Sequence, residues 1–222
     1  MPSVLVVDDQ FLIRSGLTAL LRAAPGFDPV GEAANGDEAV RLAAGTRPDV
    51  ILMDIRMPGT DGITATERVL AAAAADPLGA PAPRVLVLTT FDTDEYVYRA
   101  LRAGASGFLL KDTPPDRLLA AIETVHAGEM LFSPGPLKGL VEAWTPAVRT
   151  TSTVLEVLTP REREVFALVG AGLSNSEIAQ RLVLSAATVK THVHRCMGKL
   201  ALSSRAQAVV LAHEHGVVAR TV

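Results

Sequence analysis

The 222-residue chain is 49% hydrophobic and 20% charged, a composition typical of folded globular proteins that argues against a largely disordered or fibrous one. Its single cysteine, Cys196, excludes an intramolecular disulfide and a cysteine metal cluster. The net charge of −3 hides an asymmetry, because residues 151–222 contain eight Lys and Arg against five Asp and Glu, whereas the rest contains 13 against 19. We therefore expect an acidic N-terminal domain and a mildly basic C-terminal domain with different partners.

The first 126 residues alternate short apolar runs with amphipathic stretches. The apolar runs predict five strands, at Val4–Val7, Pro29–Ala33, Val50–Asp54, Val85–Leu88 and Phe108–Lys111. Helical patterns follow them, at Leu12–Leu21, Gly36–Leu42, Gly62–Ala75, Glu95–Ala103 and Pro114–His126. This alternation predicts an α/β fold with a five-stranded, doubly wound parallel sheet.

Polar side chains stand where four of these strands end. Asp54 ends the third strand, whose four preceding residues are all apolar, as in a strand buried on both faces. Asp8 and Asp9 follow the first strand, Thr89 the fourth, and Lys111 ends the fifth. Because the carboxyl ends of parallel strands form one edge of the sheet, we expect these five residues to converge there.

The three carboxylates favour phosphoryl chemistry at this edge. Carboxylates held together repel one another, so they need a cation or raised pKa values. An acidic cluster of oxygen ligands without His or Cys suits Mg²⁺, which also accepts phosphate oxygens. A carboxylate such as Asp54 can attack a phosphoryl group and form an aspartyl phosphate. Lys111 and Thr89 would supply the cation and the hydroxyl that hold the transferred oxygens.

These residues and their surroundings resemble the receiver domain of bacterial two-component response regulators. The resemblance rests on Asp8-Asp9, the Met-Asp-Ile-Arg-Met-Pro segment around Asp54, Thr89, and Gly104 to Lys111. It implies a flavodoxin-like fold in which a sensor histidine kinase phosphorylates Asp54. It also implies these roles: Mg²⁺ bound by Asp8, Asp9, Asp54 and the backbone carbonyl of Arg56, phosphate held by Thr89 and Lys111, and Phe108 as an aromatic switch.

Two other functions compete with this interpretation. A phosphatase could use Asp54 as its nucleophile, but it would need a proton-donating acid two residues later, where the chain has Arg56. A binding module could keep the domain for structure alone, although the complete polar set argues against it. We interpret Arg56, Asp61 and Asp92 as solvated loop side chains.

A linker and a basic helical domain follow. Residues 127–153 are rich in Gly, Pro and Thr, and they include an amphipathic spacing of Leu137, Leu140, Val141 and Trp144 that predicts a short helix. Beyond them, Thr159 with Glu162 and Ser174 with Glu177 form two capping boxes, each starting a helix. Ser185 caps a third helix over Ala186–Leu200.

The second and third of these helices, joined by a tight turn, predict a helix-turn-helix. Val189, Val193, Met197 and Leu200 form the expected buried stripe of the third helix. Its polar sides carry hydroxyls and cations that suit contacts with phosphates and base edges, namely Thr188, Lys190, Thr191, His194 and Arg195.

Residues 158–212 resemble the LuxR-type DNA-binding domain of the NarL/FixJ class of response regulators. The matching motifs are Leu158 to Glu162, Ser176 to Ala179, Thr188 to Val193, and Lys199-Leu200. The resemblance implies that Lys190, Thr191 and His194 face DNA, and that the last helix, Ser204 to His213, mediates dimerisation.

The sequence as a whole therefore predicts a transcription factor and not an enzyme. We expect a receiver domain at residues 1–126, a linker at 127–153 and a helix-turn-helix domain at 154–222. Phosphorylation would promote a homodimer that binds double-stranded DNA at a two-fold symmetric operator. No apolar run is long enough to span a bilayer, and Asp8 and Asp9 stand where a signal peptide would be apolar, so we expect a cytoplasmic protein without a membrane partner.

Overall fold

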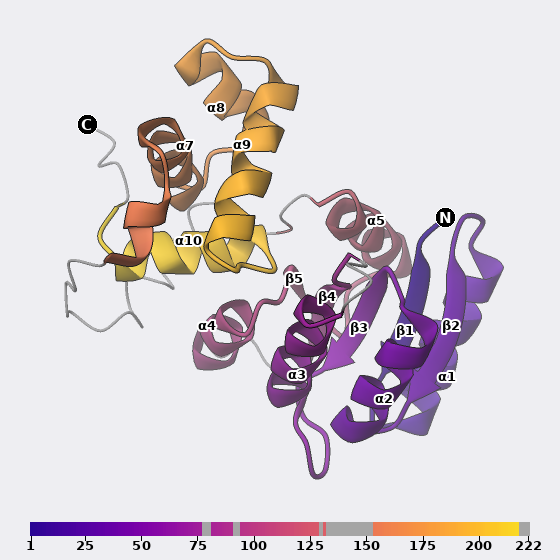
Figure 1. Ribbon diagram of the computed structural model, residues 1–222. Coiled ribbons are helices and arrows are strands. Elements are labelled where there is room, and N and C mark those ends of the chain that lie inside the picture. The colour runs from indigo at the N-terminus through magenta and orange to yellow at the C-terminus, as the bar shows by residue number, and fades with distance from the viewer. Residues whose placement is uncertain (77–80, 91–93, 129–130, 132–152, 218–222) are drawn as a thin grey trace. The chain divides into compact units, whose positions relative to one another are not determined.

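The computed structural model describes residues 1–76, 81–90, 94–128, 131 and 153–217, which form two compact units, Met1–Leu131 and Phe132–Val222 (Figure 1). The helix expected around Trp144 lies outside these described residues. Among the helices within them, none is both long enough and apolar enough to traverse a bilayer.

The first unit is an α/β layer structure built on a five-stranded parallel sheet with the order β2-β1-β3-β4-β5, which confirms the predicted fold class (Figure 1). Its strands are β1 (Ser3–Val7), β2 (Asp28–Ala33), β3 (Val50–Asp54), β4 (Arg84–Thr89) and β5 (Gly107–Leu110). Its helices are α1 (Phe11–Ala23), α2 (Gly36–Thr46), α3 (Gly62–Ala74), α4 (Asp94–Arg102) and α5 (Pro115–His126). Each helix joins one strand to the next or follows the last, as the alternation of patterns predicted.

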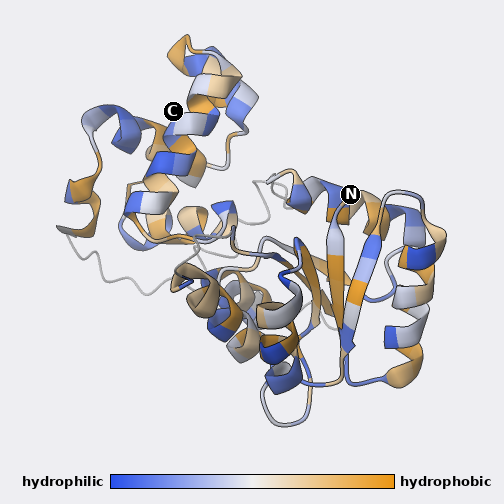
Figure 2. Ribbon diagram, turned by 45° about the vertical axis from the view of Figure 1, so that its right-hand side comes forward, coloured by the Kyte–Doolittle hydropathy of each residue, from blue (hydrophilic) through white to orange (hydrophobic). Residues whose placement is uncertain are grey.

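Both faces of the sheet are buried beneath helices. Ile51 and Met53 of β3 join a cluster with apolar residues of α2, α3 and α4, whereas Val50 and Leu52 join a second cluster with residues of α1 and α5. This split follows from the two-residue period of a strand, which sends successive side chains to opposite faces. In Figure 2 the central strands are mostly hydrophobic, while the helices carry both hydrophobic and hydrophilic residues.

Two helix starts in the first unit are fixed by side-chain caps. The Asn35 side chain accepts a hydrogen bond of 2.9 Å from the Glu38 amide at the start of α2. Asp61 accepts one of 2.7 Å from the Thr64 amide at the start of α3. The interpretation of Asp61 as a solvated loop acid was therefore wrong, because its carboxylate satisfies an unpaired amide of the first turn.

The second unit is helical, with a 3₁₀ turn, η1 (Thr153–Val157), followed by α7 (Pro160–Gly170), α8 (Asn175–Leu182), α9 (Ala186–Lys199) and α10 (Arg205–Glu214) (Figure 1). Both predicted capping boxes form, and Ser185 caps α9. Val189 and Val193 of α9 are buried together with Cys196. Met197 and Leu200, expected in the same buried stripe, are only half-buried.

One ion pair ties α7 to α9 inside this unit. Lys199 Nζ lies 2.6 Å from Glu162 Oε2, and the Glu162 carboxylate also accepts a hydrogen bond of 2.9 Å from the Thr159 amide. The hydrogen bonds from Lys199 and from the Thr159 amide lower the pKa of Glu162 from 4.5 to about 2. Because the folded-state pKa lies below the ordinary value, ionised Glu162 stabilises the folded unit above about pH 4.5 and loses that effect as the pH falls toward 2.

Replacing Glu162 by Gln should therefore weaken the second unit at neutral pH but not at pH 2. Gln keeps the shape and the cap and removes the charge that attracts Lys199. We expect lower hydrogen-exchange protection of α7 and α9 amides in E162Q at pH 7, and protection equal to wild type near pH 2. E164Q, on the same helix but at an exposed pair with Arg161, is the matched control and should change little. Equal protection of E162Q and wild type at both pH values would show that the ion pair adds nothing.

Candidate functional site

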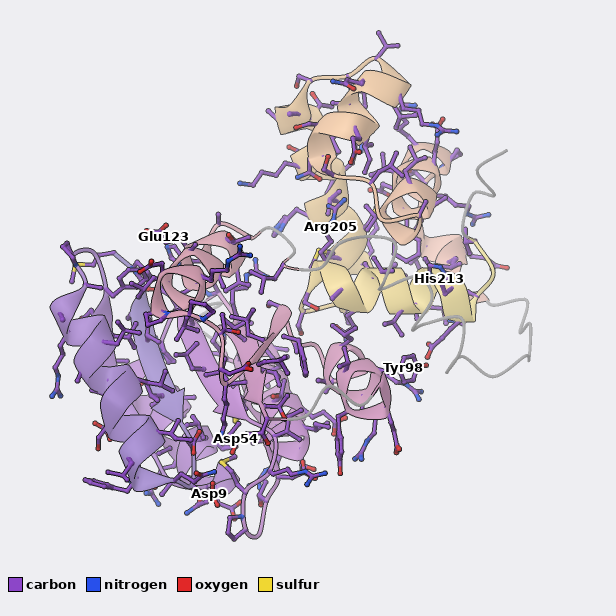
Figure 3. The ribbon with its side chains drawn as sticks, turned by 180° about the vertical axis from the view of Figure 1, so that it is seen from behind. Asp9, Asp54, Tyr98, Glu123, Arg205 and His213 are labelled. Carbon is purple, nitrogen blue, oxygen red and sulfur yellow. The ribbon has the colours of Figure 1, made fainter. Side chains whose placement is uncertain are left out.

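The three expected carboxylates meet at the carboxyl edge of the sheet. Strands β1 and β3 are neighbours, with Val7 paired to Met53, so the residues that follow them lie side by side. Oxygens of Asp8, Asp9 and Asp54 all lie within 4.8 Å of one another. Asp8 and Asp54 are 1% and 4% exposed, whereas Asp9 is exposed. Figure 3 shows Asp9 and Asp54 together at this edge of the sheet.

Lys111 neutralises part of this cluster. Its Nζ lies 2.6 Å from Asp8 Oδ2 and 2.9 Å from Asp54 Oδ2, and its side chain is only 7% exposed. Its backbone amide donates a 2.8 Å hydrogen bond to the carbonyl of Thr89, which continues the pairing of β5 with β4 past the strand end. Lys111 is therefore positioned by the sheet itself.

The charges in the cluster do not balance. Burial raises the pKa of Asp54, and the charge of Asp8 raises it further, against the opposing effect of Lys111. Burial alone would lower the pKa of Lys111, but its hydrogen bonds to Asp54 and Asp8 raise it, so the amine stays charged. Three carboxylates around one ammonium leave an excess of negative charge. The donor set, oxygen only and grouped within one ion's reach, fits a hard divalent cation such as Mg²⁺.

The remaining predicted residues lie on or just after β3, β4 and β5. Thr89 is buried at the end of β4. Phe108 is half-buried in β5, paired beside Val87 and packed on the core cluster that contains Met53. The Arg56 amide donates a 3.4 Å hydrogen bond to Asp54 Oδ1. The Arg56 guanidinium lies 5.3 Å from the centre of the Tyr96 ring, so this side chain is stacked and not merely solvated as expected.

Arg14 of α1, which the sequence patterns did not single out, supports the loop beside this cluster. Its Nη1 donates a 2.7 Å hydrogen bond to the backbone carbonyl of Asp8, and its Nε lies 3.4 Å from Glu32 Oε2 on β2. Arg14 thereby fixes the loop that carries Asp8 and Asp9. The only available signal was a cation among the apolar residues that start α1, which does not by itself indicate a partner.

The second unit presents a polar helix face to solvent. Val183 to Ser185 form the turn between α8 and α9, so α9 is the second helix of a helix-turn-helix. All five residues predicted to contact DNA are exposed along it: Thr188, Lys190, Thr191, His194 and Arg195. A solvent-facing helix with several cations suits a polyanion in a groove.

Both units match known families. Residues 4–123 match the family described as "Response regulator receiver domain", and residues 156–212 match "Bacterial regulatory proteins, luxR family". The chain belongs to the NarL/LuxR family of two-component response regulators. It is a DNA-binding transcription regulator with an acidic phosphorylation-site cluster, and not an enzyme.

Relatives of this response regulator are similar over nearly their whole length. The transcriptional regulatory protein YxjL of Bacillus subtilis is 40% identical, covering 97% of this chain and 96% of that protein. The nitrate/nitrite response regulator NarL of Escherichia coli is 35% identical over 97% of this chain and 96% of its own length. Among solved structures, a LuxR-family response regulator from Aurantimonas is 34% identical with a TM-score of 0.56, covering 64% of this chain and 97% of that one.

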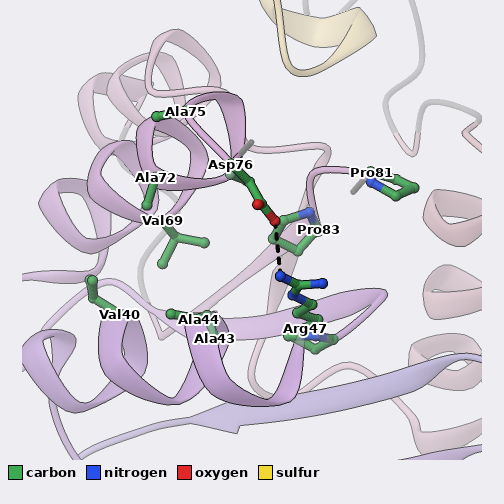
Figure 4. Close-up of a pocket in the computed structure, with 12 residues that line it drawn as sticks. Val40, Ala43, Ala44, Arg47, Val69, Ala72, Ala75, Asp76, Pro81 and Pro83 are labelled. Atoms are coloured by element: carbon green, nitrogen blue, oxygen red, sulfur yellow. Dashed lines mark ion pairs between the residues drawn. The ribbon is translucent and has the colours of Figure 1, made fainter. Parts of the chain in front are cut away.

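A separate cavity of about 330 Å³ lies between α2 and α3 of the response regulator's first unit (Figure 4). Its lining is mostly alanine, valine and proline side chains, and an ion pair of 3.2 Å between Arg47 and Asp76 crosses its rim. None of the phosphorylation-site residues lines it. The one carboxylate among the lining residues that the structure describes, that of Asp76, is paired with Arg47, and no second acid or lysine is among them, so the cavity does not resemble the acidic cluster.

Proposed function

We propose that a sensor histidine kinase phosphorylates Asp54, and that phosphorylation promotes a homodimer that binds a two-fold symmetric DNA operator. The observation that carries this proposal is the contact of buried Asp54 with Lys111 inside an acidic cluster, in a chain that also exposes the polar face of α9. We place the receiver at residues 1–126, the linker at 127–153 and the DNA-binding domain at 154–222. The family supports a cytoplasmic protein whose partners are a sensor histidine kinase and DNA.

The cluster supplies the parts for phosphoryl transfer. An oxygen of Asp54 attacks phosphorus, a P–O bond forms, and the P–N bond to the kinase histidine breaks, returning the electron pair to the imidazole. Lys111, whose Nζ lies 2.9 Å from Asp54 Oδ2, and Thr89 then hold the phosphoryl oxygens. Mg²⁺, bound by Asp8, Asp9, Asp54 and the backbone carbonyl of Arg56, would neutralise charge on these oxygens.

Phosphorylation then biases a two-state surface. The new charge draws Lys111 and Thr89 toward the phosphoryl group, and Phe108, on β5 three residues before Lys111, changes position. Two DNA-binding domains that are joined bind the two half-sites with far higher affinity than either alone, so dimerisation can switch operator occupancy. We assign α10 to the dimer interface of the DNA-binding domain.

Measurements of oligomeric state and of the DNA sequence that the protein selects test whether phosphorylation controls dimerisation and DNA binding. Wild-type protein is analysed before and after treatment with acetyl phosphate and Mg²⁺, by light scattering and by selection from a randomised duplex library. We expect treated protein to become dimeric and to enrich a two-fold symmetric site. Selection of the same site with the same affinity without phosphate would retain the DNA-binding function and refute control by the receiver.

Lys190→Ala should weaken DNA binding and flatten its salt dependence. Lys190 is exposed on the first turns of α9, where its ammonium can reach a phosphate or a guanine. Losing one phosphate contact lowers the slope of log K against log salt by about 0.9. A loss of affinity with an unchanged slope would assign Lys190 to a base, and no loss would remove it from the interface. Arg41→Ala, which removes an exposed cation from the first unit, is the charge-matched control.

A further inference from the structure

The hydroxyl groups at the start of α9 already form hydrogen bonds within the helix. Ser185 Oγ accepts a 3.0 Å hydrogen bond from the Thr188 amide and forms a 2.8 Å hydrogen bond with Thr188 Oγ1, in which either hydroxyl can be the donor. One turn on, Thr191 Oγ1 donates a 3.0 Å hydrogen bond to the carbonyl of Ala187. The hydroxyl proton of Thr191 is thus committed to the backbone.

This bond decides which part of Thr191 faces outward. Threonine is branched at Cβ, so fixing its hydroxyl also fixes its methyl group. Thr191 is exposed, and because its hydroxyl lies against the backbone, the methyl group is the part that a partner meets. Ala187, also exposed, lies one turn earlier on the same side of the helix. Ala187 and Thr191 together form a small apolar strip on a polar surface.

Lys190 and His194 form a second strip beside the first. They are also four residues apart and exposed, so they too share a side of α9. Their nitrogens can donate to phosphates or to purine acceptors, which the apolar strip cannot do. Over these two turns, the outer face of α9 therefore has one strip that forms hydrogen bonds and one that offers methyl groups, and the exposed cation Arg195 follows the second strip one turn later.

The major groove offers one apolar group among the base edges, the C5 methyl of thymine. We propose that Thr191, with Ala187, recognises a thymine in each operator half-site by methyl contact, and that its hydroxyl does not read a base. This inference rests on the proposed DNA-binding function and adds the base that this strip selects. The alternative is a Thr191 oxygen that accepts a hydrogen bond from the amino group of cytosine or adenine.

Uracil substitution separates the two. The full chain, treated with acetyl phosphate and Mg²⁺, first selects its site from a randomised duplex library. Each thymine of the selected duplex is then replaced in turn by uracil, which lacks only the methyl group. For wild type we expect one thymine per half-site whose replacement weakens binding about fourfold, the effect of burying one methyl-sized group.

Two variants of Thr191 test whether its methyl group or its hydroxyl causes the preference for thymine over uracil. Thr191→Val keeps the methyl group and removes the hydroxyl, so it should retain the fourfold preference for thymine over uracil. Thr191→Ser keeps the hydroxyl and removes the methyl group, so it should bind both duplexes equally. Thr124→Ser makes the same change on α5 of the first unit, where the threonine hydroxyl likewise donates a hydrogen bond to the carbonyl four residues earlier, and should keep the wild-type preference.

The outcomes distinguish this inference from the proposed function. A Thr191→Ser protein that still prefers thymine, or a Thr191→Val protein that does not, overturns the methyl contact. A selected site with no uracil-sensitive thymine also overturns it, while leaving sequence-specific DNA binding in place. Failure of treated wild type to select any site refutes the proposed function itself, and the inference with it.

Discussion

Asp54→Asn is expected to abolish transfer of a phosphoryl group from acetyl phosphate to the protein in the presence of Mg²⁺. The amide oxygen of Asn is a poor nucleophile, and the change also removes one of the three clustered carboxylates. Wild-type protein should gain one acid-stable, base-labile phosphoryl group by intact mass, and Asp54→Asn should gain none. The same variant should fail to dimerise in response to acetyl phosphate.

Unfolding would not explain such a loss. The folded site raises the pKa of Asp54 above its ordinary 3.8, mainly by burial. A folded-state pKa above the unfolded value means that folding favours the protonated acid, so stability falls as the pH rises through that interval. The charged carboxylate is thus unfavourable to folding at pH 7, and we expect Asp54→Asn to be at least as stable as wild type there, as urea denaturation would show.

A matched variant controls for the substitution itself. Asp61→Asn makes the same change seven residues later, at the cap of α3, where Asn can accept the Thr64 hydrogen bond as Asp does. It should be phosphorylated at the wild-type level. Persistent acyl phosphate on the Asp54→Asn protein would place the phosphoacceptor elsewhere and refute the proposed function.

Much of this site follows from the position of residues along the strands. Asp54 and Lys111 are 57 positions apart, yet both stand at strand ends, and parallel strands bring such ends to one edge. The contacts made by longer side chains did not follow. Arg14 donates a hydrogen bond to the Asp8 carbonyl, and Arg56 lies over the Tyr96 ring. The number of residues that separates such a pair follows no rule from which the contact could be predicted. Such contacts depend on packing of elements that periodicity does not place.

In the fold, too, local features were predictable from the sequence and long-range features were not. Helix starts such as Thr159 and Ser174 were predictable because their caps act within four residues. The strand order β2-β1-β3-β4-β5 did not follow from periodicity, since alternation of strands and helices is compatible with several orders, and only the resemblance to receiver domains implied it. Val183 ends α8 with φ of 55°, a left-handed conformation that a β-branched residue rarely adopts. No local sequence pattern predicts this conformation of Val183, because it depends on how the turn connects two packed helices.

Replacing Gly62 by Ala is expected to destabilise the first unit by about 3 kcal/mol, because the added Cβ would overlap main-chain atoms of Asp54. A Cβ at Gly62 would lie 1.9 Å from the carbonyl oxygen of Asp54 and 2.8 Å from its carbonyl carbon. Neither atom belongs to a flexible side chain, so α3 or the end of β3 must move. The Gly62 amide also donates a 2.9 Å hydrogen bond to the Ile55 carbonyl, which such a movement would strain.

Gly16→Ala provides the opposite expectation. Gly16 lies within α1, and a Cβ there has nothing within 4 Å, so alanine should stabilise the unit by about 0.5–1 kcal/mol. Urea denaturation and hydrogen exchange of the β3 amides measure both variants. Wild-type protection of β3 in Gly62→Ala would mean that the loop relaxes freely. Because the clash falls on Asp54, the proposed phosphoacceptor, the Gly62 variant should also accept a phosphoryl group from acetyl phosphate more slowly than Gly16→Ala, which would link the close approach of α3 to the position of Asp54.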